Sequence, residues 1–408
     1  MQTQASPHRL MALAFAMSLG AAISLGITRF SYGLLLPPMR HDLNWSYALA
    51  GAMNMANAGG YFLGAVATPV LMRWFGASLV LMVGAALASG FMVLSGFLTD
   101  VQPLLILRCL AGFASALLFV AGGLLAARLG ARNPLRAGLL LGVYYGGTGI
   151  GIAISSFVVP WVLQATADQL HGWRWAWWAL GGLCVLASGV LVWPARVMAL
   201  WDVHRDTPAE HAANVAHGFV WRRFTFGLAA YGLFGVGYIG YMTFVVALLR
   251  TQGRSAGEVS VFYGLLGLAV VASSRIWARL LDRYKDGRPM ALLNTLLGIA
   301  TLIPATTQYW PMVLSSGAMF GAVFLSVVAA STALVRHNVG HTAWPAGIGV
   351  FTAVFAAGQI VGPGVVGWIA DGSGGLERGL VFSALALWVA AALAYQQRQV
   401  GAQAVALA

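Results

Sequence analysis

Two arginines lie inside long apolar stretches, where a charged side chain has little water to solvate it. Arg29 belongs to the run ITRFSYGLLLPP, and Arg108 opens the run RCLAGFASA. An ionised residue at membrane depth is costly, so it usually faces a protein interior or a water-filled cavity and marks a functional site. A guanidinium group can hold a carboxylate or a phosphate through two parallel hydrogen bonds. The chemistry that these positions suggest is therefore the binding of a small anion.

The elements that must position these arginines are predicted to be membrane helices. The chain has 408 residues, of which 60% are hydrophobic and only 8% are charged, whereas a soluble domain carries about 25% charged residues. Short alternating segments typical of a membrane β-barrel are not seen. Runs of about 20 apolar residues each suffice to cross a bilayer as a helix. We place twelve of them, at 10–36, 47–72, 77–98, 102–127, 137–163, 175–195, 222–249, 257–281, 289–308, 311–335, 345–369 and 379–397.

The distribution of basic residues predicts the orientation of these helices. Fifteen Lys and Arg residues fall in the segments on the side of the N-terminus, and five fall in the segments on the other side. This excess predicts that both termini are cytoplasmic. We expect the membrane to be the inner membrane of a bacterium. The excess also explains the net charge of +12 better than nucleic-acid binding, because no basic patch is interleaved with exposed aromatics. The first apolar run is too long for a signal peptide and is interpreted as a retained span.

A polar segment at 200–220 divides the chain into two parts of similar size. We expect an all-α membrane protein with an N-terminal six-helix bundle at 1–199, a cytoplasmic linker at 200–220 and a C-terminal six-helix bundle at 221–408. The two bundles are predicted to be related by pseudo-symmetry, as parallel repeats in transporters are.

Internal repeats support this division. Tyr32 has a counterpart in Tyr241, 209 positions later, and the spacing Gly147-x-x-x-Gly151 returns 211 positions later as Gly358-x-x-x-Gly362. A nearly constant offset of half the chain is typical of a duplicated bundle. Arg108 breaks the repeat, because Gly317 stands at the corresponding position.

With these motifs, the sequence resembles the major facilitator superfamily of secondary transporters over its whole length. Arg108-x-x-x-Gly112 resembles the fourth-helix motif of that superfamily, and the stretches ITRFSYGLLLPPMRHDLNWS and NMANAGGYFLGA resemble its YbfB-like branch. The segment 282–288 resembles a cytoplasmic gating loop, whereas the equivalent first loop has Arg73 where an acid is expected. The resemblance implies transport by alternating access and assigns gating or conformational roles to Gly112, Arg73, Asp282, Arg283, Arg288, Gly358, Gly362 and Pro363.

Both arginines are predicted to lie at similar depth. Arg29 is about eight residues from the outer end of the first span and Arg108 about six from that of the fourth, or about 12 and 9 Å. The resembled fold places both spans at a central cavity. Alternatively, each arginine could bond to carbonyls of a broken helix or extend outward to water. The candidate substrate-binding residues in the cavity are Arg29, Tyr32, Asn54, Asn57, Tyr61, Arg108, Tyr145, Tyr238, Tyr241 and Gln359.

Three of these candidates share one helix face. Asn54, Asn57 and Tyr61 follow the spacing i, i+3, i+7, so their side chains are expected to point the same way. They could face the cavity, or they could form hydrogen bonds between helices, which contribute about 0.6 kcal/mol each in membranes. Both interpretations remain open at this stage.

Other chemistries find little support in the sequence. All eleven acidic residues fall in loops or at helix ends, with Glu258 and Asp371 closest to a span. Three alternatives follow: proton coupling runs through these acids, it runs through protonation of the substrate, or it is absent. No buried acid or histidine is available to activate a nucleophile, which argues against an enzyme. His337 and His341 stand four apart without a carboxylate, so neither a metal site nor a cofactor is expected.

The sequence thus predicts a secondary transporter that moves a small solute, expected to be an organic anion, across the cytoplasmic membrane by alternating access. Its partners are expected to be that substrate, the lipid bilayer and a coupling proton, with the protein as a monomer. The alternative is a membrane sensor or scaffold that kept the transporter fold without transporting, an interpretation suggested by Arg73 in the first gating loop.

Overall fold

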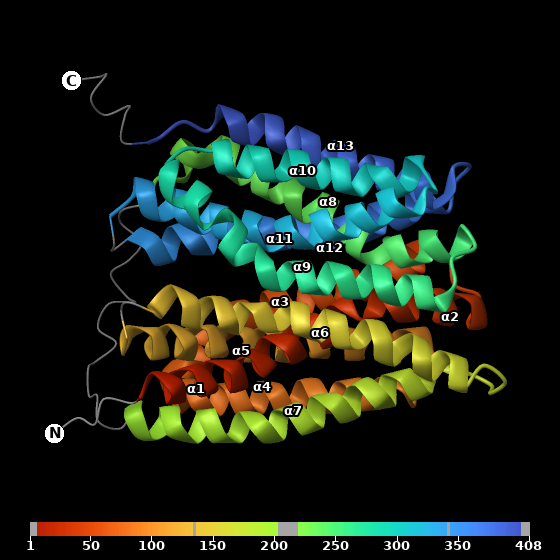
Figure 1. Cartoon of the computed structure of the whole chain (residues 1–408), viewed down its shortest axis with the longest axis horizontal. Helices are drawn as coiled ribbons and strands as arrows, with labels where there is room; N and C mark the ends of the chain where they lie inside the picture. The colour runs from red at the N-terminus through yellow and green to blue at the C-terminus, as the bar shows by residue number, and fades with distance from the viewer. Residues whose placement is uncertain (1–5, 134–135, 203–218, 341–342, 401–408) are drawn as a thin grey trace. The chain divides into compact units, whose positions relative to one another are not determined.

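The computed structural model describes residues 6–133, 136–202, 219–340 and 343–400, and the elements in these ranges are helices (Figure 1). The first predicted span consists of three consecutive segments, α1 (Pro7–Ala21), the π-helix η1 (Ala22–Phe30) and α2 (Tyr32–Asp42). The remaining helices are α3 (Tyr47–Phe75), α4 (Ala77–Ser95), α5 (Val101–Ala131), α6 (Ala137–Ala165), α7 (Trp173–Asp202), η4 (Trp221–Phe224), α8 (Thr225–Thr251), α9 (Ala256–Arg283), α10 (Arg288–Thr306), α11 (Trp310–Asn338), α12 (Trp344–Ala370) and α13 (Gly375–Gln396).

Eleven helices of the described chain are long and apolar enough to cross a membrane. Helix α3 coincides with the predicted second span but is not one of the eleven, because its two asparagines and its glycines lower its hydropathy. Twelve spans therefore remain a prediction. Helix α7 continues to Asp202, past the predicted start of the linker at 200, and residues 203–218 of that linker lie outside the described residues.

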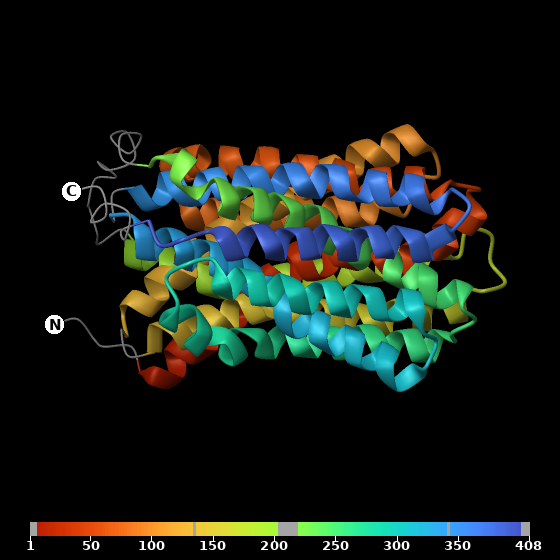
Figure 2. The same ribbon diagram turned by 90° about the horizontal axis from the view of Figure 1, so that it is seen from above.

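The chain packs into two compact units, which do not coincide with the two sequence halves. Unit 1 consists of 1–45, 56–207 and 255–271, and unit 2 consists of 46–55, 208–254 and 272–408. The start of α3 therefore packs with the second half of the sequence, and the start of α9 packs with the first half. Within unit 2, α13 lies against both α8 and α10, as both views show (Figures 1 and 2).

Equivalent glycines bring equivalent helices together in the two units. In unit 1, a Cβ atom on the first glycine of Gly147-x-x-x-Gly151 would overlap the carbonyl oxygen of Ser18, so α6 lies directly on α1. In unit 2, the first glycine of Gly358-x-x-x-Gly362 approaches the carbonyl oxygen of Gly232 in the same way, which brings α12 onto α8. Small residues allow such close approach between membrane helices. The repeat in the sequence thus corresponds to a repeated helix contact.

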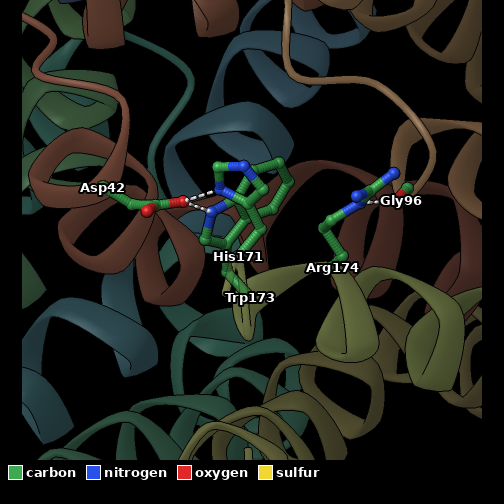
Figure 3. Close-up of polar contacts among 5 residues, drawn as sticks. All are labelled: Asp42, Gly96, His171, Trp173 and Arg174. Atoms are coloured by element: carbon green, nitrogen blue, oxygen red, sulfur yellow. Dashed lines mark hydrogen bonds and ion pairs between the residues drawn. The ribbon is translucent and has the colours of Figure 1, made fainter. Parts of the chain in front are cut away.

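At one end of unit 1, polar side chains form hydrogen bonds between segments at the ends of three helices (Figure 3). The carboxylate of Asp42, at the end of α2, accepts hydrogen bonds from His171 Nδ1 and Trp173 Nε1, both at 2.5 Å. Arg174, in the first turn of α7, donates from Nε to the carbonyl oxygen of Gly96 at 2.7 Å. These bonds connect the end of the first span to the start of α7 and to the end of α4.

Candidate functional site

The first span is interrupted by a π-helical segment. The backbone from Ala22 to Phe30 forms η1, and every side chain in this segment is buried. Proline is absent from its sequence, AISLGITRF. Helix α6 lies very close to it, because a Cβ atom on Gly26 would stand 2.6 Å from the carbonyl oxygen of Thr148. π-helical segments are rare and are frequently found at functional sites, so η1 is the element around which the candidate site is built.

Side chains of α5 bind the carbonyl groups of this segment. Arg108 donates from Nη1 to the carbonyl oxygen of Thr28 at 2.8 Å. Ser24 and Ser115 exchange hydrogen bonds, each hydroxyl donating to the other's carbonyl oxygen, at 2.8 and 3.2 Å. A backbone carbonyl oxygen can accept more than one hydrogen bond. These three bonds therefore tie α5 to the backbone of η1.

Arg108 lies between aromatic rings. Its side chain is 1% exposed, and its guanidinium carbon is 5.0 Å from the ring centre of Tyr32 and 5.7 Å from that of Trp177. Asn57 donates to the backbone carbonyl of Arg108 at 3.1 Å. The structure thus brings together three predicted residues, Arg108, Tyr32 and Asn57. The bond from Arg108 to the carbonyl oxygen of Thr28 is of the kind named as an alternative in the sequence analysis, in which an arginine binds a backbone carbonyl.

Arg29 belongs to η1 itself and lies against another tyrosine. Its guanidinium carbon is 5.5 Å from the ring centre of Tyr61, and the residue is 4% exposed. Between residues 1 and 167 the sequence has two acidic residues, Asp42 and Asp100, and both stand at helix ends. Both arginines therefore lie buried within predicted spans, whereas the two acidic residues of this part of the chain lie at the ends of helices.

Tyr145, the remaining candidate of unit 1, joins a separate group of aromatic rings. It is 37% exposed, and its ring centre is 5.5 Å from that of Phe119 and 5.1 Å from that of Tyr144. This group lies between α5 and α6.

In unit 2, Tyr238 and Gln359 are brought together. The Tyr238 hydroxyl donates to Gln359 Oε1 at 2.8 Å, and both residues are buried. The ring of Tyr238 is stacked near those of Phe234, Phe324 and Phe355, at centre distances of 4.8, 5.9 and 5.6 Å. These residues form a row of nearly parallel aromatic rings contributed by α8, α11 and α12.

Tyr241 has contacts that parallel those of its counterpart in unit 1. Its hydroxyl shares a hydrogen bond of 2.8 Å with Ser316 Oγ, beside Gly317. Tyr32 packs on Arg108, the residue that corresponds to Gly317 in the repeat. Each tyrosine therefore contacts the same region of the equivalent helix, but only unit 1 has a cation there.

The predicted face of α3 is divided between the two units. Asn54 lies in unit 2 and donates to Thr243 Oγ1 of α8 at 2.8 Å. Asn57 lies in unit 1 and donates to Arg108, as described above. Both asparagines thus form hydrogen bonds between helices, the alternative that was left open, and Tyr61 contacts Arg29.

The residues with predicted gating roles occupy different kinds of positions. Gly112 lies so close to α3 that a Cβ atom would overlap the carbonyl oxygen of Asn57. Likewise, a Cβ atom on Gly51 of α3 would overlap the carbonyl oxygen of Pro363 in α12. Three charged residues are exposed at helix ends, namely Arg73, Asp282 and Arg283. Arg288 forms an ion pair of 3.3 Å with Asp286.

A polar contact that sequence reasoning missed joins α3 to α12 within unit 2. The carboxylate of Asp371 accepts hydrogen bonds from the backbone N–H groups of Tyr47 at 2.7 Å and Ala48 at 2.9 Å. The first N–H groups of a helix have no partner in the helix, so a carboxylate there both satisfies them and interacts with the helix dipole. The sequence placed Asp371 near a span but could not indicate its partner.

Sequence reasoning missed Trp177 and identified Ser115 only as a small residue of the run RCLAGFASA, because contacts with a backbone or a guanidinium leave no pattern in a sequence. Among the described residues there is no group of three or more His, Cys, Asp or Glu side chains that could hold a metal ion. His341 lies outside the described residues, and so do the histidines of the predicted linker.

Comparisons with known proteins match this architecture. The family described as "Uncharacterised MFS-type transporter YbfB" matches residues 21–395. A gallate transporter of Pseudomonas putida is 26% identical over 87% of this chain and 84% of its own length. An MFS-type efflux pump of Mycolicibacterium smegmatis is 27% identical over 95% of this chain and 92% of its own. A bacterial homologue of the human lysosomal transporter Spinster, in an inward-facing and unoccupied conformation, has a similar fold, with a TM-score of 0.70 at 15% identity over 96% of this chain and 97% of that one.

The family match covers most of the chain, and the apolar helices agree with it. The protein is an integral, multi-pass membrane protein and belongs to the YbfB-like family of major facilitator superfamily transporters.

Proposed function

We propose that this transporter moves a small organic anion across the cytoplasmic membrane by alternating access, and that Arg29 is the cation that binds it. The observation that carries the proposal is the location of Arg29 in a buried π-helical segment. Transporters commonly bind substrates where a membrane helix is interrupted. An arginine at such a position supplies a planar donor pair that fits a carboxylate.

The balance of charge supports an anion rather than a cation or a neutral sugar. Arg29 and Arg108 are both nearly completely buried, and the two acidic residues between positions 1 and 167, Asp42 and Asp100, stand at helix ends. Because a buried charge is stabilised strongly by an opposite charge, binding an anion offsets part of the cost of burying these groups. A cationic substrate would add to that cost.

The two arginines are proposed to have different roles. Arg108 uses Nη1 to bind the carbonyl of Thr28, directly before Arg29, and its guanidinium group lies near two aromatic rings. We therefore assign Arg108 as a positioning residue that fixes the backbone from which the Arg29 side chain extends. Tyr61 lies against the guanidinium group of Arg29 and is proposed to contact the substrate together with it.

One of the relatives supports an anionic substrate. It is named for gallate, which is an aromatic carboxylate.

Alternating access requires contacts between the sequence halves that can break and re-form. Three polar contacts have this character. The bonds of Asp371 to the start of α3 and the bond from Asn54 to Thr243 lie in unit 2. In unit 1, Tyr263 of α9 donates to the carbonyl oxygen of Phe30 at 2.8 Å. We propose that these contacts hold one conformation of the transport cycle and are released in the other.

Uptake into proteoliposomes tests the role of Arg29. Aromatic and aliphatic carboxylates are first screened by the thermal stabilisation of the purified protein, since a ligand that binds the folded state raises its melting temperature. For an anion that binds, Arg29→Gln should reduce affinity by about 10- to 100-fold, because a hydrogen bond to a charged group contributes about 1.5–3 kcal/mol. Arg29→Lys should retain part of the affinity. Unchanged uptake in Arg29→Gln would refute the proposal.

The alternative of a non-transporting sensor or scaffold rests on Arg73, which is exposed in the last turn of α3 where the resembled gating loop would have an acid. The same assay separates the two functions. Binding of the anion without flux in either direction would favour the sensor. Uptake that is half-saturated at an anion concentration close to the dissociation constant would support the transporter.

A further inference from the structure

A surface groove in unit 2 has no role in the proposed transport site. It lies where the end of α9, the start of α10 and the end of α13 meet, and its volume is about 790 Å³. Six of the residues that line it are Tyr284, Arg288, Leu292, Thr295, Trp388 and Tyr395. We refer to it as the α10–α13 groove.

Close packing between α10 and α13 forms the floor of this groove. A Cβ atom on Gly298 would overlap the indole ring of Trp388, and the indole Nε1 donates to the carbonyl oxygen of Thr295 at 3.3 Å. The backbone N–H of Gly287 donates to the carbonyl oxygen of Gln397 at 2.9 Å. The two helices are therefore joined at Trp388, within the helices, and again at Gln397, just beyond the end of α13. The groove between them is a fixed feature of the fold.

The walls of the groove are mainly apolar, and the apolar surface continues along the exposed sides of α10 and α13. Leu292 is 42% exposed. Farther along the same two helices, Ile299, Leu385 and Val389 are also exposed. In an integral membrane protein such a surface is covered by acyl chains, because leaving it in contact with water is unfavourable. An acyl chain that follows these residues would enter the groove at Trp388.

The open end of the groove carries positive charge. The segment 279–288 contains four basic residues and two acidic ones, which gives it a net charge of +2. Arg288 lines the groove and remains 60% exposed in its side chain even though Nε pairs with Asp286. Arg398 follows the end of α13 and adds a further charge. Basic residues near the membrane surface attract anionic lipids.

We propose that the α10–α13 groove binds one anionic phospholipid, with an acyl chain along Leu292 and Trp388 and the phosphate at Arg288. The arginine excess predicts that this end of the helices faces the cytoplasm, where the leaflet is anionic. A soluble anion such as free phosphate would use the basic end of the groove but not its apolar walls. The combination of both features identifies a lipid rather than a soluble ion.

The proposal is tested by native mass spectrometry of the full-length protein, released from nanodiscs of phosphatidylcholine that contain phosphatidylglycerol with the same acyl chains. The wild-type protein should retain one phosphatidylglycerol in preference to phosphatidylcholine. Arg288→Gln should reduce this preference about fivefold, the factor expected for one basic residue near the membrane surface. Arg378→Gln, which removes an exposed arginine at the other end of α13, is the matched control and should leave it unchanged.

A second variant tests the apolar part of the site independently of charge. Ala392 lines the groove and is exposed, so Ala392→Phe should fill it and reduce the retention of both lipids, with size-exclusion chromatography to verify folding. Equal effects of Arg288→Gln and Arg378→Gln would overturn the proposal, and so would unchanged lipid retention in Ala392→Phe. Displacement of the bound lipid by inorganic phosphate alone would also overturn it, because the site would then be an ion site.

Discussion

The carboxylate of Asp371 is predicted to control how readily the start of α3 separates from α12. Asp371→Asn keeps the size of the side chain but removes its charge. The two backbone N–H groups that it binds, those of Tyr47 and Ala48, are the first of α3. The amide of asparagine has one oxygen, so it can keep at most one strong acceptor at this helix end.

The size of the effect follows from these contacts. A hydrogen bond to a charged group contributes about 1.5–3 kcal/mol, against about 0.5–1.5 kcal/mol for a neutral one. The interaction of a carboxylate with a helix N-terminus adds about 0.3–1 kcal/mol. Replacing the charged acceptor at Asp371 should therefore cost the contact about 1–2 kcal/mol. This shifts the equilibrium between joined and separated forms by about five- to thirtyfold towards separation.

Distance measurements between two spin labels test this prediction. The labels are placed at Ser46→Cys and Ser373→Cys, beside the contact, in a background in which Cys109 and Cys184 are replaced by serine. Asp371→Asn should increase the fraction of long distances, whereas Glu377→Gln, which removes an exposed carboxylate six residues away, should not. A distance distribution that is the same in Asp371→Asn and in the unsubstituted protein would refute the reasoning.

Two further substitutions test the packing of unit 1. Gly147→Ala should lower the melting temperature and destabilise the protein by about 1–3 kcal/mol, because its Cβ atom would overlap the backbone of α1; Gly182→Ala, with open space around it, is the control and should be neutral or slightly stabilising. Asp42→Asn should also lower the melting temperature, by an amount corresponding to about 1–3 kcal/mol, because His171 and Trp173 lose a charged acceptor. An unchanged melting temperature in either Gly147→Ala or Asp42→Asn would contradict the packing described here.

Much of the fold could be predicted from the sequence, because membrane helices are determined by local apolar length. The spacing of Gly147 and Gly151, repeated as Gly358 and Gly362, indicated a duplicated bundle, and in the structure these glycines lie against neighbouring backbones. Glycine spacing is informative because only the absence of a side chain permits that distance. Helix α3, at the predicted second span, is not among the eleven apolar helices, and its asparagines form contacts between helices.

The π-helical segment could not be predicted. The stretch from Ala22 to Phe30 lacks proline, and the arginine within it does not by itself indicate a π-helix. Its geometry depends on partners far along the chain, such as Arg108 and Ser115 of α5. The sequence therefore predicted similar depths for the two arginines but could not show that one of them binds the backbone beside the other.

Helical periodicity alone was also insufficient for α3. Asn54 and Asn57 are three residues apart and share a face, yet they bind different helices in different units. A helix that passes from one packing unit to the other contacts new neighbours within one turn. Spacing describes the direction of a side chain, but the partner that it meets depends on the tertiary fold.

A structure of the protein with a transported carboxylate bound is the most direct test of the central claim. The proposed function predicts that the carboxylate lies about 3 Å from the guanidinium nitrogens of Arg29, with Tyr61 beside it, while Arg108 keeps its bond to the carbonyl of Thr28. A bound carboxylate that contacts Arg108 instead, or that lies away from both arginines, would contradict it.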